Sequence, residues 1–66
     1  MKLTVNGNEM EFQDEISVQS MLEAMNNKNK MIVVEKNLEI VPKENFPITI
    51  LKEGDIIEII SFVGGG

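Results

Sequence analysis

The chain has 66 residues, which is enough for one small domain, and 42% of them are hydrophobic. Six basic against 11 acidic residues give a formal net charge of −5, and Trp and Tyr are missing, so nucleic acid is a poor partner. Cys and His are also missing, which excludes disulfides, thiol nucleophiles and ordinary zinc sites. No apolar run spans a membrane and no signal peptide is visible, so we expect a cytoplasmic protein. We also expect the chain to be monomeric alone.

The first residues predict a β-hairpin. Leu3 and Val5 alternate with polar residues, as in a strand with one buried face. Asn6-Gly7 follows, a dipeptide suited to the positive φ angles of a tight turn. The alternation then resumes at Met10 and Phe12.

One helix is predicted after the hairpin. Ser17 can cap it by accepting a hydrogen bond from a free N–H of the first turn. Apolar residues then recur at the spacing of a single helical stripe: Val18, Met21, Leu22 and Met25. The polar run 26–30 ends the helix.

Two strands are predicted next. Residues 31–34 form a β-branched run typical of an inner strand, and 35–37 indicate a turn. Residues 38–41 form a short strand that ends at Pro42, which cannot donate to a sheet ladder. Residues 43–47 are irregular, with Phe46 expected to fill the space beneath them.

The remaining residues complete an α+β fold. Residues 48–51 extend again, 52–55 form a turn, and 56–62 form the last strand. The order is therefore β-β-α-β-β-β, in which a mixed sheet packs on one main helix. The first and last strands are expected side by side at the centre of the sheet.

The last strand predicts a docking surface. Ile57 and Ile59 fall on one face, while Ile56, Glu58, Ile60 and Phe62 fall on the other. Because one helix covers one face, Ile60 and Phe62 become exposed if Ile57 and Ile59 meet the helix. We expect Ile60 and Phe62, with the adjoining Val63, to contact a partner. The alternative is that Phe62 folds back over an edge of the core.

The glycine tail is the main candidate functional segment. We divide the chain into a domain at residues 1–63 and a flexible tail at 64–66. Glycine lacks Cβ, so Gly64 and Gly65 can thread a narrow enzyme tunnel and present the carboxylate of Gly66 inside it. The alternative is a frayed end or a linker remnant.

Catalytic residues of the chain's own are scarce. Its serines and threonines have no His to activate them. Asp14/Glu15 and Glu53/Asp55 are candidate acid–base pairs, but acidic residues in turns are usually solvated. Met21 and Met25 could suggest a soft-metal or adaptable binding surface, yet their place on the helix stripe favours the core. We therefore expect neither catalytic residues nor a metal site.

The whole chain resembles the ThiS family of bacterial sulfur carriers, which are ubiquitin-like β-grasp proteins. Three segments carry the resemblance: the strand ending in Asn6-Gly7, Asn37 with Glu39-Ile40-Val41-Pro42-Lys43, and Leu51 with Gly54-Asp55-Ile56-Ile57-Glu58 running on to Gly65-Gly66. Lys43 stands where the family has Arg, which keeps the charge but loses the bidentate fork.

The resemblance implies sulfur carriage for thiamine (thiazole) biosynthesis. A ubiquitin-activating-like adenylyltransferase of the ThiF type would use ATP and Mg²⁺ to adenylate the Gly66 carboxylate. A persulfide donor would then leave a thiocarboxylate there, and a thiazole synthase of the ThiG type would take the sulfur. The nucleotide and metal belong to the activating enzyme, so we expect no cofactor bound to this chain, which acts as a co-substrate.

Other functions remain open at this point. The small subunit of molybdopterin synthase also carries sulfur on a terminal Gly-Gly, but it is usually longer and typically has prolines shortly before the glycines. A protein modifier would join Gly66 to a lysine by an isopeptide bond. A structural adaptor would not need Gly65 and Gly66 at all.

Overall fold

The structure is a computed structural model, and it describes residues 1–29 and 31–62. Its elements follow the predicted order, and they are β1 (Lys2–Val5), β2 (Asn8–Glu11), α1 (Val18–Ala24), β3 (Ile32–Lys36), β4 (Glu39–Val41), the 3-10 turn η1 (Lys43–Asn45) and β5 (Ile56–Ser61). The expectation of a β-β-α-β-β-β chain is confirmed.

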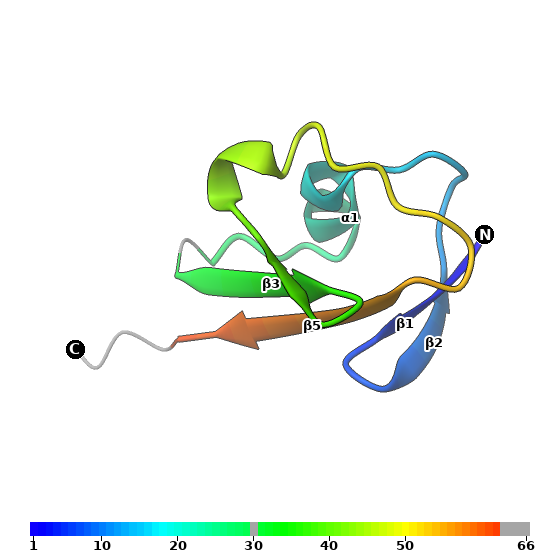
Figure 1. The fold of residues 1–66 in the computed structure, drawn as a ribbon, viewed down its shortest axis with the longest axis horizontal. Helices are drawn as coiled ribbons and strands as arrows, with labels where there is room; N and C mark the ends of the chain where they lie inside the picture. Colours follow the sequence, from blue (N-terminus) through cyan, green and yellow to red (C-terminus); the bar gives the residue numbers. More distant parts are fainter. Residues whose placement is uncertain (30, 63–66) are drawn as a thin grey trace.

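The sheet has the strand order β2-β1-β5-β3-β4. β5 runs parallel to β1 and antiparallel to β3, so the first and last strands are neighbours and β5 is the middle strand, as predicted. Helix α1 lies across one face of the sheet, and β5 leads away from the β1–β2 turn toward the C-terminus (Figure 1).

The core lies between α1 and the sheet. Ser17 caps the helix as predicted, with its hydroxyl oxygen accepting from the backbone N–H of Ser20 at 3.0 Å. The helix is shorter than its apolar stripe, because Met25 is already the C-cap. The buried residues are all apolar and form one cluster: Leu3, Val5, Ile16, Val18, Met21, Leu22, Val34, Val41, Phe46, Leu51, Ile57 and Ile59. Phe46 is therefore the predicted plug.

One local expectation was wrong. Glu35 and Lys36, predicted in a turn, belong to β3, and the turn is made by Asn37 and Leu38 with φ of 51° and 72°. Residues 48–51 form no ladder with the sheet. Ile50 makes an isolated β-bridge with Ser17 instead. The backbone of this segment bonds to the approach to α1, where Val18 N–H donates to the Thr49 carbonyl oxygen at 2.9 Å. The segment therefore crosses over the start of the helix.

Asn6 extends the ladder of β5 where β1 turns away. Its backbone has φ of 50°, and the next residue, Gly7, has φ of 83°, as a tight hairpin turn requires. The Asn6 side chain then makes the hydrogen bonds to β5 that the backbone of a neighbouring strand would make. Its Oδ1 accepts from Ile59 N–H at 2.7 Å, and its Nδ2 donates to the Ile59 carbonyl oxygen at 3.2 Å. Both backbone polar groups of Ile59, its N–H and its carbonyl oxygen, thereby have hydrogen-bond partners.

Replacing Asn6 with glycine should lower the free energy of unfolding by about 1–3 kcal/mol, because two part-buried hydrogen bonds are lost. Glycine is chosen because it adopts the positive φ without strain. Asn26→Gly is the matched control, since Asn26 has a similar φ of 61° and is also exposed, but its side chain makes no hydrogen bond with the described residues. Urea denaturation of both variants tests this, and an equal effect at the two positions would show that the Asn6 amide contributes nothing beyond its backbone conformation.

Candidate functional site

The predicted docking residues lie at the end of β5. Ile60 and Phe62 are 45% and 51% exposed, whereas Ile57 and Ile59 are buried against the helix side. The expected division of the strand into two faces is therefore confirmed, and Phe62 does not fold back into the core. Val63, Gly64, Gly65 and Gly66 lie outside the described residues.

Strand β5 is held along both edges up to this point. At its start, the Asn37 Nδ2 donates to Asp55 Oδ1 at 3.0 Å and its Oδ1 accepts from Ile56 N–H at 2.9 Å. At its end, Phe62 N–H donates to the Met31 carbonyl oxygen at 2.8 Å. Together with Asn6, these contacts fix the position of β5 up to Phe62.

The sheet face away from α1 continues the exposed apolar surface of β5. Antiparallel partners point to the same side of a sheet, so Val33 lies beside Ile60, and Ile40 beside Glu35. Ile40 and Ile56 are 67% and 51% exposed. Sequence reasoning placed Ile56 on this face but missed Val33, Glu35 and Ile40. Their side depends on the register of β3 with β5, and the pairing of Val34 with the buried Ile59 settles it.

The candidate acid–base pairs have structural contacts instead. Asp14 Oδ1 lies 3.2 Å from the ammonium group of Met1. Glu53 Oε1 accepts from Lys2 N–H at 2.8 Å, and Asp55 Oδ2 accepts from Lys52 N–H at 2.8 Å. The Asp55 carboxylate closes its own turn, and the carboxylates of Asp14 and Glu53 contact the first two residues of the chain, which favours a structural role for these three side chains.

The two helix methionines pack as core residues. Met21 is fully buried, and Met25 packs partly buried against the core cluster. Across residues 1–29 and 31–62, no group of three or more His, Cys, Asp or Glu side chains could hold a metal ion. In the same part of the chain, the α-helix α1 has seven residues and is too short for a membrane span.

Comparison with known proteins identifies the family. The ThiS family model matches residues 3–66. The sulfur carrier protein ThiS of Bacillus subtilis is 38% identical over 65 residues, covering 97% of this chain and 98% of that protein. A thiazole synthase of Paramagnetospirillum magneticum is 39% identical over 66 residues, so the whole chain matches 20% of the length of that enzyme.

A solved structure agrees with the fold. The crystal structure of the thiamine biosynthesis protein ThiS from Geobacter metallireducens superposes with a TM-score of 0.86 at 35% identity, and the match covers all of both chains. The predicted ubiquitin-like β-grasp is thereby confirmed for the described sheet and helix. The family model, the full-length sequence relative and the solved fold lead to one assignment, and this chain belongs to the ThiS family.

Proposed function

We propose that this chain is a sulfur carrier for thiamine (thiazole) biosynthesis, with the carboxylate of Gly66 as the group that carries sulfur. The observation that supports this most is the match to the Bacillus subtilis sulfur carrier across nearly all of both chains, together with a family-model match that runs through Gly66. The fixed strand β5 supports it further, because it sets the position from which residues 63–66 continue. The chain would act as a protein co-substrate rather than as an enzyme.

The chemistry begins with an unreactive carboxylate. One oxygen of the Gly66 carboxylate attacks the α-phosphate of ATP on an activating enzyme of the ThiF type, with Mg²⁺ there, and pyrophosphate leaves. The terminal sulfur of a cysteine persulfide then attacks the acyl carbon, and AMP leaves. A thiol then attacks the cysteine sulfur of the remaining S–S bond, which forms a new disulfide and releases the thiocarboxylate. ATP and Mg²⁺ belong to the partner enzyme, so no resident cofactor is proposed for this chain.

Thiazole synthase is the proposed acceptor of the sulfur. The Paramagnetospirillum magneticum thiazole synthase supports this choice, because one segment of that longer protein resembles this whole chain. Ile60, Phe62 and Val63 are proposed to dock on the partner enzymes, since the first two are exposed next to the tail. Gly64 and Gly65 are proposed to pass through the partner's active-site channel. Cytoplasmic location and a monomeric free state stay predictions.

Intact-mass measurement tests the carrier function. The full chain is incubated with a ThiF-type enzyme, Mg-ATP and a persulfide donor. We expect a mass gain equal to the replacement of one oxygen by sulfur, located on Gly66 by fragmentation. Omission of ATP should leave the mass unchanged. Higher-mass adducts on protein lysines would instead identify a modifier, and no change with any cognate partner would refute the proposal.

A further inference from the structure

The sheet face away from α1 carries two carboxylates in an apolar setting. We call it the open face, and its outward side chains include Val33, Glu35, Ile40, Ile56, Glu58 and Ile60. Glu35 and Glu58 are direct cross-strand partners of β3 and β5. Their Cβ atoms are therefore about 5 Å apart, and both side chains are half-buried. Like charges in this position destabilise a sheet.

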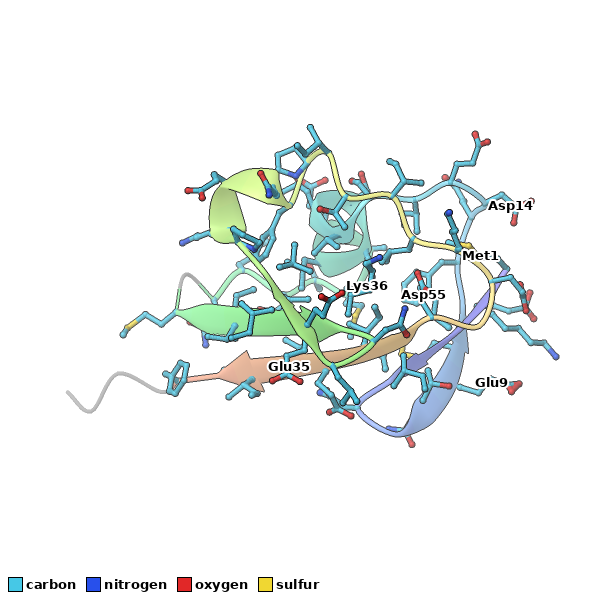
Figure 2. The ribbon with its side chains drawn as sticks, viewed as in Figure 1. Met1, Glu9, Asp14, Glu35, Lys36 and Asp55 are labelled. Atoms are coloured by element: carbon cyan, nitrogen blue, oxygen red, sulfur yellow. The ribbon has the colours of Figure 1, made fainter. Side chains whose placement is uncertain are left out.

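The described residues provide no counter-charge for this pair. Lys36 follows Glu35 in sequence but points to the opposite side of the sheet, because it pairs with the buried Ile57 (Figure 2). Among the described residues, Lys2 and Glu9 form an ion pair on the open face at 3.6 Å. This pair lies on the β1–β2 hairpin. Apolar neighbours flank the two glutamates instead. Val33 and Ile60 form the next cross-strand pair, and Ile40 lies beside Glu35.

This pattern defines the chemistry of a partner. The apolar side chains favour burial against another protein, and the two carboxylates require a cation at the centre of the contact. A guanidinium group fits best, because it can donate in its plane to carboxylates on both sides. The net charge of −5 opposes nucleic acid or an anionic membrane as the occupant.

We propose that the open face docks on thiazole synthase, and that a basic side chain of the enzyme, framed by apolar residues, inserts between Glu35 and Glu58. This rests on the function proposed above and adds a specificity determinant to it. The Paramagnetospirillum magneticum enzyme, in which a segment similar to this chain belongs to the thiazole synthase itself, favours this partner. The carboxylate pair lowers the stability of the free carrier and becomes favourable in the complex.

Titration calorimetry of the full chain with the thiazole synthase of the same organism tests this proposal. Glu35→Gln and Glu58→Gln should each raise Kd about tenfold at low salt and reduce its salt dependence. The double variant should lose less than the product of the two single effects, because both side chains hold one cation. Glu39→Gln is the control and should leave Kd unchanged, because Glu39 pairs with Lys36 on the opposite side of the sheet.

A stability readout separates recognition from a structural role. The same Glu35 and Glu58 variants should raise the melting temperature of the free carrier by about 2–4 °C, because they remove the repulsion. Weaker binding together with higher stability is the expected signature. Unchanged Kd, an equal effect of Glu39→Gln, or no binding by the wild-type chain would overturn the proposal. The mass test on Gly66 is independent, so sulfur loading of these variants shows whether the carrier function itself stands.

Discussion

Deleting Gly65 and Gly66 is expected to abolish sulfur loading and to leave the free energy of unfolding unchanged. The proposed chemistry takes place on one carboxylate, and shortening the chain withdraws that group from a catalytic centre that lies in another protein. Placing a carboxylate several ångströms from the reacting phosphate removes the advantage of proximity, which can be worth orders of magnitude in rate. ATP–pyrophosphate exchange with the activating enzyme and intact-mass measurement would show the loss.

The same prediction can be made without changing the length of the chain. Gly65→Val keeps the terminal carboxylate but adds a branched side chain to the segment proposed to pass through the channel. We expect at least about a 100-fold loss in kcat/KM for adenylation, by the same positioning argument. Denaturation curves should match those of the wild-type chain, because the buried core named above lies within residues 3–59. Full loading of the truncated chain would show that Gly66 is not required, and full loading of Gly65→Val would contradict passage through a narrow channel.

These experiments distinguish a carrier from an adaptor. The chain has no His and no Cys, and three of the four candidate acid–base carboxylates, those of Asp14, Glu53 and Asp55, make structural contacts. The described residues contribute a hydrogen-bonded last strand and an exposed apolar face, which we propose as the docking surface. An adaptor would need the face and not the tail, whereas a carrier needs both. Activity that survives the truncation would therefore favour the adaptor reading specifically.

Most of the fold could be predicted because its strands and helix have distinct hydrophobic periods. The alternation at Leu3 and Val5 and the helical stripe at Met21 and Leu22 identify buried faces without knowledge of the partners they pack against. Ser17 and Asn6-Gly7 marked a helix start and a turn by their local chemistry. Exposure of Ile60 followed from one helix covering one sheet face.

The sequence was least informative where long-range contacts decide the local structure. Residues 48–51 were expected only to be extended, and their backbone hydrogen bonds go to Asn45, Ile16 and Val18 rather than to the sheet. Glu35 was assigned to a turn because it is polar, although β3 continues through it to reach Lys36. That error also hid the pairing of Glu35 with Glu58, since a cross-strand register cannot be read from either strand alone.

Replacing Ile57 with alanine should remove about 2–5 kcal/mol from the free energy of unfolding. Ile57 is fully buried in the middle strand, and truncating such a side chain costs both the transfer energy and the cavity that remains. A domain of this size is expected to have only about 3–10 kcal/mol in total. Urea denaturation should therefore show a large shift of the midpoint, and part of the population should be unfolded at 37 °C.

Ile56 provides the control from the adjacent position in the same strand. It is the same residue type but 51% exposed on the open face, so Ile56→Ala should cost less than about 1 kcal/mol of stability. Its loss should appear instead as a higher Kd for thiazole synthase, because apolar area is removed from the proposed interface. Ile57→Ala should show near-normal affinity for the fraction that stays folded.

Equal stability losses at the two positions would contradict the assignment of the faces of β5. Unchanged binding by Ile56→Ala would show that the contact with the enzyme does not extend to this end of the open face.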